Sequence, residues 1–263
     1  MSTGKINVSV ENIFPLIKKF LYSDHEIFLR ELVSNATDAT LKLKHLTNIG
    51  EAKVEYGNPI IEVKIDKEAK KLHIIDQGIG MTADEVEKYI NQVAFSGAEE
   101  FLEKYKDSAK DAGIIGHFGL GFYSAFMVAS KVEVLTQSYQ EDAATVYWSC
   151  DGSPEFELYE VEKKQRGTKI ILHVNEESAE FLDAFKLKGI LEKFCKFLPI
   201  PIFFTDVNAE VKKEEEKEEE NGKGIDTLSH SNSNSNSNSN LNWDSENSQQ
   251  EKNEESFLPK NNS

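Results

Sequence analysis

The chain has 263 residues and a formal net charge of −16, a length that fits one large domain or two small ones. This acidic balance disfavours a bare nucleic-acid surface, and no run approaches the roughly 18 apolar residues of a membrane span. The two cysteines, Cys150 and Cys195, are far apart and outside any zinc-ligand spacing, which fits a reducing compartment. The N-terminus lacks the apolar core of a signal peptide, so we expect a cytoplasmic protein that does not bind membranes.

The spacing of apolar residues predicts mainly helices early in the chain and mainly strands later. In chain order the expected elements are a strand over 5–10, helices over 11–22 and from Ser23 or Asp24 to about 45, strands over 60–66 and 71–76, helices over 83–93, 96–106 and 122–129, strands over 131–137, 145–150, 156–161 and 167–174, helices over 178–185 and 187–197, and an extended segment over 198–205. Thr82 and Glu85 have the spacing of a capping box at the start of the 83–93 helix. Strands that follow strands, with grouped helices, indicate an α+β domain with a largely antiparallel or mixed sheet.

The residues after Asp206 have almost nothing to bury. Residues 207–263 contain 13 acidic and 6 basic side chains, including the run KKEEEKEEE, and five Ser-Asn repeats occupy 231–240. Such composition is typical of disorder. We therefore expect one domain over 1–206 and a solvated acidic tail over 207–263, with a tail that binds a basic partner as the alternative.

A polar stripe borders the apolar face of the second helix, in the stretch FLRELVSNATDA. At 100° per residue, Glu31, Asn35 and Asp38 lie within roughly 60° of one another, whereas Thr37 and Thr40 are expected on the side away from the apolar residues. Carboxylates and an amide beside a core are costly to bury without a partner. A divalent metal, an activated water or a ligand would each satisfy them, and a solvated helix face is the alternative.

Two glycine-containing stretches add to this pattern. Asp76 ends a predicted strand and is followed by Gly78 and Gly80, so its carboxylate can accept a hydrogen bond from an exocyclic amine while the backbone approaches a ligand. A plain Asp-Gly turn is the alternative. The stretch GHFGLGF at 116–122 places glycines directly before a helix, where backbone N–H groups favour anions. It is neither a P-loop nor a dinucleotide-binding fingerprint within a βαβ unit.

Together these stretches resemble the nucleotide site shared by gyrase B subunits, ninety-kilodalton heat-shock chaperones, histidine kinases and MutL proteins. The segments FLYSDHEIFLRELVSNATDA, DQGIGMT, FSGAEEF, IIGHFGLGFYSAFMVA and RGTKIILH are most similar to the N-terminal domain of the chaperones, above all of the bacterial HtpG branch. The resemblance covers about 5–204. It implies the Bergerat fold, a two-layer sandwich with helices on one face of a mostly antiparallel or mixed sheet, and it implies ATP and Mg²⁺ as ligands.

The resemblance also implies a role for each matching residue. Glu31 is expected to be the general base that orients the attacking water, and Asn35 the amide that holds Mg²⁺ against the phosphates. Asp76 is expected to accept the adenine amino hydrogen, with Thr168 supporting it through water. The other expected nucleotide-binding residues are Asp38, Gly80 and Met81 at the adenine pocket and Gly119, Gly121 and Phe122 at the phosphates.

Residues 94–121, with glycines near both ends, match the mobile lid that closes over bound nucleotide. Phe95 stands in this lid where relatives often have a lysine that reaches the nucleotide, so we expect charge assistance from that position to be lost. The family's middle domain, which supplies an arginine to the γ-phosphate, and its C-terminal dimerisation domain are expected to be absent. Because a cationic finger contributes orders of magnitude in phosphoryl transfer, a slow ATPase and a monomer are expected.

Three functions fit these residues to different degrees. The first is an ATP-binding, weakly ATP-hydrolysing chaperone domain, with unfolded client proteins and co-chaperones as partners. The second is a non-catalytic module that holds nucleotide or a co-chaperone; Phe95 and the missing middle domain favour it, and the intact Glu31 argues against it. The third, a kinase domain or a DNA-linked ATPase, is disfavoured by the chaperone-like lid and by the lack of a phosphoacceptor histidine segment or a basic surface.

Overall fold

The computed structural model describes residues 24–92, 97–106, 113–116, 120–162 and 165–209. The chain divides into two compact units, Met1–Glu218 and Glu219–Ser263, and every described residue belongs to the first unit. The strand expected over 5–10, the helix expected over 11–22 and residues 210–263 lie outside the described residues.

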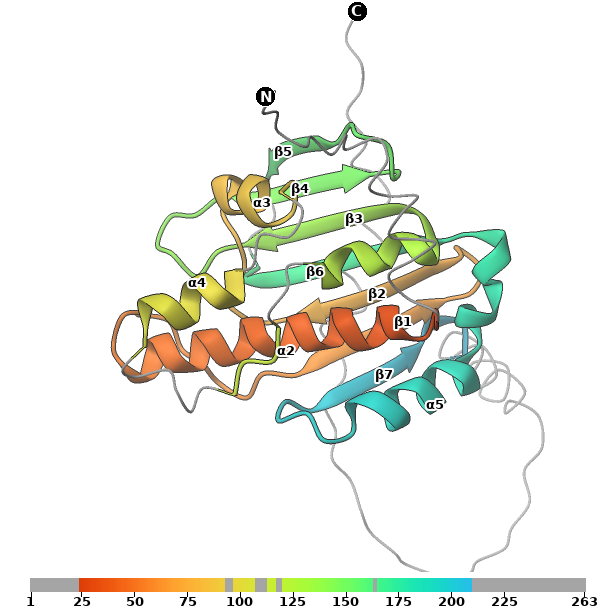
Figure 1. Ribbon diagram of the computed structural model, residues 1–263, viewed down its shortest axis with the longest axis horizontal. Helices are drawn as coiled ribbons and strands as arrows, with labels where there is room; N and C mark the ends of the chain where they lie inside the picture. The colour runs from red at the N-terminus through yellow and green to blue at the C-terminus, as the bar shows by residue number, and fades with distance from the viewer. Residues whose placement is uncertain (1–23, 93–96, 107–112, 117–119, 163–164, 210–263) are drawn as a thin grey trace, which may run out of the picture. The chain divides into compact units, whose positions relative to one another are not determined.

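One seven-stranded sheet forms the base of the domain, with its strands in the order β5-β4-β3-β6-β2-β1-β7 (Figure 1). The strands are β1 (Ile61–Asp66), β2 (Lys71–Asp76), β3 (Ala129–Gln137), β4 (Thr145–Cys150), β5 (Glu157–Val161), β6 (Gly167–Val174) and β7 (Ile202–Asp206). Neighbouring strands are antiparallel except β1 and β7, which are parallel. The expected α+β fold with a mostly antiparallel, mixed sheet is confirmed.

The described helices cover one face of this sheet (Figure 1). They are α2 (Ile27–Asn48), α3 (Ala83–Tyr89), α4 (Gly97–Lys104), α5 (Ala184–Cys195) and the 3₁₀ helices η3 (Gly121–Met127) and η4 (Glu176–Leu182). The capping box of Thr82 and Glu85 is present, but α3 ends at Tyr89 rather than near 93. The helices expected over 122–129 and 178–185 are instead the 3₁₀ helices η3 and η4. Short 3₁₀ helices are common as connections between longer elements. None of the described helices is long and apolar enough to cross a membrane.

Helix α2 is buried on more of its surface than its apolar spacing predicts. Phe28 and Leu32 are fully buried in the main core, where the Phe28 ring meets Phe181 edge-on at 5.1 Å. Thr37 and Thr40, expected on the side away from the apolar residues, are also fully buried, so that expectation was wrong. Their hydroxyls donate to the carbonyl oxygens of the preceding turn of α2, at 2.9 and 2.8 Å, which makes their burial inexpensive.

A second apolar cluster joins the C-terminal half of α2 to α4. Its buried members are Leu43, Leu46, Ala52, Phe101 and Tyr105. The α2 helix is therefore packed on two sides, by the sheet and by the helix of the lid segment.

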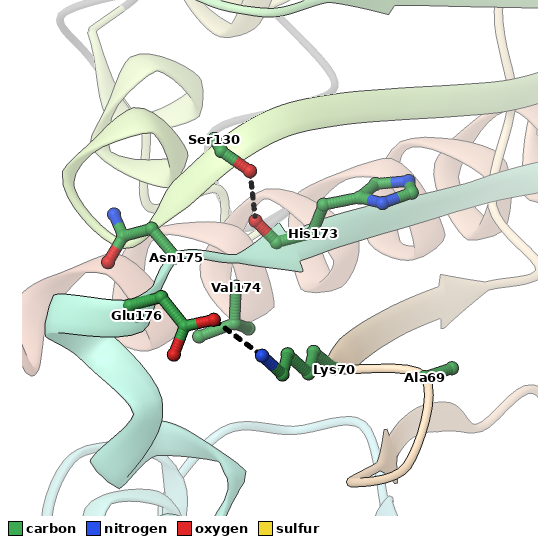
Figure 2. Close-up of a pocket in the computed structure, with 7 residues that line it drawn as sticks. All are labelled: Ala69, Lys70, Ser130, His173, Val174, Asn175 and Glu176. Atoms are coloured by element: carbon green, nitrogen blue, oxygen red, sulfur yellow. Dashed lines mark hydrogen bonds and ion pairs between the residues drawn. The ribbon is translucent and has the colours of Figure 1, made fainter.

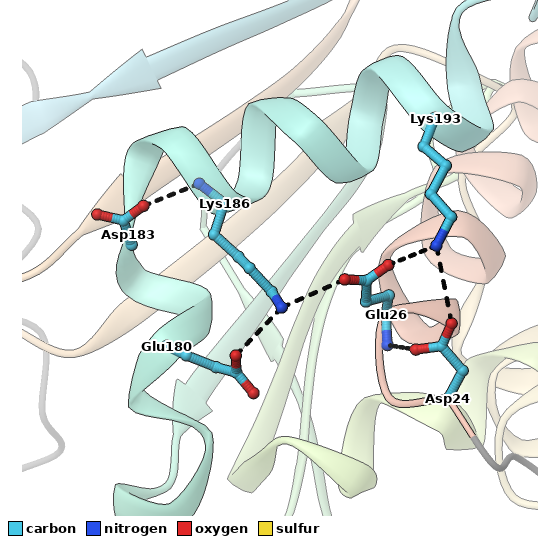
Figure 3. A network of polar contacts seen from close by, with 6 residues as sticks. All are labelled: Asp24, Glu26, Glu180, Asp183, Lys186 and Lys193. Atoms are coloured by element: carbon cyan, nitrogen blue, oxygen red, sulfur yellow. Dashed lines mark hydrogen bonds and ion pairs between the residues drawn. The ribbon is translucent and has the colours of Figure 1, made fainter.

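The N-terminal end of α2 is tied to α5 by a network of charges (Figure 3). Glu26 Oε2 lies 2.8 Å from Lys193 Nζ, and Glu26 Oε1 lies 3.2 Å from Lys186 Nζ. Asp24 Oδ1 accepts a hydrogen bond from the backbone N–H of Glu26 at 3.0 Å. Glu26 is the N-cap residue and forms no side-chain cap hydrogen bond, so the Asp24 contact takes the place of the cap expected from Ser23 or Asp24. The hydrogen bond from Lys193 lowers the pKa of Glu26.

We expect Glu26→Gln to lower the free energy of unfolding by about 0.5–1 kcal/mol at low salt, and by less in concentrated salt. Because the pKa of Glu26 is lowered in the folded state, this stability is present above the ordinary carboxyl pKa and is lost as the pH falls through the lowered value. Urea titrations measure the change. The control is Glu192→Gln, whose exposed partner Lys196 lies 3.4 Å away; equal losses for both variants would show that the network adds nothing.

Candidate functional site

The polar stripe of α2 faces the glycines on the C-terminal side of the lid segment. A Cβ atom on Gly121 would lie 2.7 Å from Glu31 Oε2, and one on Gly116 would lie 3.0 Å from Asp38 Oδ2. Real Cβ atoms essentially never approach another atom as closely as 2.7 Å, so a side chain at 121 would displace the Glu31 carboxylate. The structure thus brings the two motifs together, with bare backbone against the acid–amide–acid stripe.

Glu31 is held from one side by its neighbour on α2. Its Oε1 atom accepts hydrogen bonds from Arg30 Nη2 and, at 3.2 Å, from Arg30 Nε. The guanidinium carbon of Arg30 also lies 6.0 Å from the ring centroid of Phe194. The other oxygen, Oε2, is the atom nearest to Gly121. One carboxylate oxygen is therefore oriented by a cation while the other faces the glycine loop.

Asn35 lies between the two acidic residues. Its Nδ2 atom is 3.5 Å from the Cβ position of Gly121, and its Oδ1 atom is 3.8 Å from that of Gly116. The part of the chain that the structure describes forms no hydrogen bond with this amide, and it contains no group of three or more acidic, histidine or cysteine side chains that could hold a metal. A Mg²⁺ ion that keeps its waters and phosphate oxygens needs few protein ligands, so a single unpaired amide fits it.

Asp38 is engaged by the lid segment. Its Oδ1 atom accepts the backbone N–H of Ile115 at 2.8 Å, and its Oδ2 atom accepts that of Gly116 at 2.7 Å. The side chain is almost fully buried as a result. Asp38 was expected at the adenine pocket, and the structure adds that its carboxylate fixes the end of the lid segment to α2.

Asp76 stands at the end of β2, buried to 7% exposure, and its Oδ1 atom accepts the Gly78 N–H at 2.8 Å. The chain then turns sharply at Gly80, which has a φ of +58°; a Cβ atom there would lie 1.8 Å from the carbonyl oxygen of Gln137. Only glycine fits this position. The turn brings the Met81 N–H to Thr136 Oγ1 at 2.9 Å, so the loop after Asp76 is fixed to β3.

Thr168 is the antiparallel partner of Asp76 across β2 and β6. Its hydroxyl lies 3.0 Å from that of Thr136. Burial raises the pKa of Asp76 to about 7, while hydrogen bonds from the backbones of Gly78 and Thr168 and the charge of Arg166 act in the opposite direction. The carboxyl group therefore titrates near neutral pH, an unusual property that buried functional carboxyl groups often share.

The remaining predicted site residues divide into two groups. The Phe122 side chain points into an aromatic cluster, with its ring 5.6 Å from Trp148 and 5.8 Å from Tyr123, so only its backbone is available to a phosphate. Phe95 and Gly119 lie outside the described residues.

Two residues of this region were not singled out from the sequence. Thr136 is 1% exposed and links Met81 to Thr168. The sequence feature that could have indicated Thr136 is its hydroxyl at a core-facing position of β3, where the other core-facing residues, Val132 and Val134, are apolar. Arg166 stands beside Gly167 at the start of β6 and acts on Asp76; nothing local to its own stretch indicates this.

A pocket of about 410 Å³ lies at the C-terminal end of β6, away from Thr168 (Figure 2). Lys70 is paired there with Glu176, and the His173 ring bonds Glu133 at 2.7 Å instead of facing the pocket. None of the predicted nucleotide-binding residues lines it. Its cation and its imidazole are already engaged, so we do not regard it as the functional site.

Comparison with known proteins identifies the family. Residues 22–177, more than half of the chain, match the family described as "Histidine kinase-, DNA gyrase B-, and HSP90-like ATPase". The chain belongs to this ATPase family. Membership makes the described region a nucleotide-binding domain, and it confirms the resemblance drawn from the three motifs.

Within this ATPase family, the similar curated proteins are bacterial chaperones. The chain is 61% identical over 201 residues to "Chaperone protein HtpG" of Porphyromonas gingivalis, which covers 76% of this chain and 29% of that protein. It is 60% identical over 204 residues to the protein of the same name from Bacteroides thetaiotaomicron, covering 78% and 29%, and 44% identical over 196 residues to that of Chromobacterium violaceum, covering 73% and 31%. The chain thus spans less than a third of the length of these relatives.

The pKa of Asp76 predicts how stability changes with pH in the absence of ligand. Because this pKa is raised from 3.8 to about 7 in the folded state, the wild type should lose stability as the pH rises between these values. Asp76→Asn should remove that loss, and the difference between wild type and variant should change by up to about 4 kcal/mol between pH 4 and pH 8. Urea unfolding at several pH values measures it; parallel pH profiles for the two proteins would contradict the assignment.

Proposed function

We propose that residues 1–206 form a domain that binds Mg·ATP and hydrolyses it slowly, and that it serves as the N-terminal ATPase domain of a protein-folding chaperone. The observation that carries the proposal is the approach of Gly116 and Gly121 to the α2 stripe. The loop after Asp76 contacts the same helix, because the Ile79 N–H donates to the carbonyl oxygen of Ala39 at 3.1 Å. Contact of both glycine-containing segments with one helix supports a phosphate-binding backbone and a purine acceptor in a single site.

In this proposal, Asp76 accepts the amino hydrogen of adenine, supported by Thr168. The backbone of 119–122 supplies donors to the phosphates, and Asn35 contributes its amide oxygen to Mg²⁺, which would neutralise phosphate charge. Glu31 accepts a proton from the attacking water through Oε2, while Arg30 fixes the carboxylate in place.

The remaining nucleotide contacts follow the same division of the site. Asp38, Gly80 and Met81 line the adenine side. Closure of 94–121 over the nucleotide excludes water, and Phe95 contributes no charge there.

Chaperone activity is inferred from the relatives, which carry that name. On this basis we propose unfolded client proteins and co-chaperones as partners. From the sequence composition we propose a cytoplasmic location and a separate acidic segment over 207–263. The placement of Glu31 beside Gly121 argues against a purely non-catalytic nucleotide-binding module, because such a module would not need a carboxylate oriented at the phosphate end.

Calorimetric titration with Mg·ATP tests the purine site. We expect the wild type to bind, and Asp76→Asn to lose at least about 100-fold in affinity, because an amide cannot replace the acceptor without presenting a competing donor to the amino group. Asp66→Asn, a change of the same kind at the end of β1, is the control and should bind as the wild type does. Equal affinities for all three proteins would place the nucleotide elsewhere.

Single-turnover hydrolysis tests the proposed base. Glu31→Gln should bind Mg·ATP within about threefold of the wild type while its hydrolysis rate falls by about 10²-fold or more, since general bases contribute that much. Glu62→Gln, on the other face of the sheet, is the matched control. A turnover rate unchanged by Glu31→Gln would rule out this residue as the base and would favour the non-catalytic function.

A further inference from the structure

A row of three buried polar side chains crosses the sheet at the end of β2. Asp76 on β2 is the direct antiparallel partner of Thr168 on β6, and Thr168 is in turn the partner of Thr136 on β3. Thr136 is the least exposed of the three, at 1%, and the next position along the row is the buried, apolar Val146 on β4. Because Thr136 is closed off from solvent, its hydroxyl must find its hydrogen-bond partners within the protein.

The Thr136 hydroxyl makes three contacts and uses all of its hydrogen-bonding capacity. Its oxygen accepts the Met81 backbone N–H at 2.9 Å, and its O–H donates to the carbonyl oxygen of Gly167 at 3.2 Å. The third partner is the hydroxyl of Thr168, at 3.0 Å. A hydroxyl has one proton and two lone pairs. Because a carbonyl oxygen can only accept, the Thr136 proton goes to Gly167, and its second lone pair is left to accept the Thr168 O–H.

The direction of these bonds decides what Thr168 offers on its other side. Once its proton is donated to Thr136, the Thr168 oxygen retains a lone pair and has no donor left. Among the residues that the structure describes, this hydroxyl has no other hydrogen-bond partner. Its neighbour in the row, Asp76, is also an acceptor only when it is ionised. Two neighbouring acceptors match a ligand group that carries two hydrogens, such as the 6-amino group of an aminopurine.

We propose that Thr136 is a positioning residue of the nucleotide site: by taking the proton of Thr168, it makes that hydroxyl an acceptor towards the ligand and so favours purines that carry a 6-amino group. Loss of the Thr136 hydroxyl would leave the Thr168 proton without its acceptor, free to turn towards the ligand and oppose the amino hydrogens. The contact of Thr168 and Asp76 with the purine, direct or through water, rests on the proposed function. The hydrogen bonds of Thr136 do not, and they can be measured without nucleotide.

Hydrogen exchange of the Met81 amide in the nucleotide-free protein tests the bonds of Thr136. Thr136→Val keeps a similar shape and removes the hydroxyl, so the Met81 amide should exchange about fivefold faster than in the wild type, relative to the paired amides of β2 and β6. Thr136→Ser, which keeps the hydroxyl, should stay within about twofold of the wild type. Equal relative exchange in Thr136→Val and the wild type would show that the Thr136 oxygen is not the acceptor, and would overturn the proposal.

Calorimetric titration at pH 8, above the raised pKa of Asp76, tests the preference for the amino group. The two ligands are Mg·ADP and the magnesium complex of purine riboside diphosphate, which lacks the 6-amino group. In Thr136→Val the ratio of the two affinities should fall about fivefold, because one neutral hydrogen bond is worth about that much. Thr136→Ser should keep the wild-type ratio. So should the control Thr145→Val, since the buried Thr145 precedes Val146 and alternates to the other face of the sheet.

The ratio separates a positioning role from a structural one. A Thr136 that only supports the loop would affect both nucleotides equally, so an unchanged ratio in Thr136→Val overturns the proposal and leaves the proposed function intact. If the wild type binds neither nucleotide, the proposed function fails and the preference for the amino group fails with it. The Met81 exchange then still decides whether the Thr136 hydroxyl forms its hydrogen bonds.

The double variant Thr136→Val/Thr168→Val covers the case in which Thr136→Val does not fold. It removes the donor and the acceptor together, so it should be more stable than the single variant, whose Thr168 hydroxyl has lost its partner. Its affinity ratio should be reduced as in the single variant, because the Thr168 acceptor is gone. A double variant that is no more stable than Thr136→Val, or that keeps the wild-type ratio, would contradict the proposal.

Discussion

Every polar group that α2 and β2 bring into the interior needs a partner, and this constraint shapes the site. Thr37 and Thr40 bond to the preceding turn of their own helix, and Asp38 bonds to two lid N–H groups. Asp76 bonds to Gly78. Once these groups are satisfied, the Asn35 amide and Glu31 Oε2 are the polar groups of the stripe that still face the glycine loop. The cost of burying polar atoms thus separates structural residues from those available to a ligand.

The sheet supplies the rigid half of this arrangement. Strand β6 inserts between β2 and β3, although nearly a hundred residues separate it from β2 in sequence. This pairing places Thr168 opposite Asp76 and brings the Thr136 hydroxyl to within 3.0 Å of that of Thr168. The opposite wall is α2, which packs on the sheet and carries the lid segment on its other side. One wall of the site is therefore fixed by strand pairing, and the other is a helix that also packs against α4.

In the proposed function, Asp76 is subject to a conflict between stability and ligand binding. An ionised carboxylate in this position is disfavoured by burial, which is why its pKa is raised to about 7. The ionised carboxylate is nevertheless the form that accepts the stronger hydrogen bond from an amino group. Hydrogen bonds from the backbones of Gly78 and Thr168 and the charge of Arg166 offset part of this cost. Asp76 is therefore a residue whose replacement by a neutral side chain would be expected to stabilise the fold.

The sequence by itself determined the local elements and the chemistry of the stripe. Strands β1 and β2, the capping box at Thr82 and the placement of Glu31, Asn35 and Asp38 beside a buried face follow from periodicity and short-range hydrogen bonds, which neighbouring residues decide. The burial of Thr37 and Thr40, the bonding of Asp38 to the backbones of Ile115 and Gly116 and the pairing of Thr168 with Asp76 depended on the tertiary structure. Each requires segments far apart in the chain to pack together, and such packing overrides local preference because it decides which surfaces leave water.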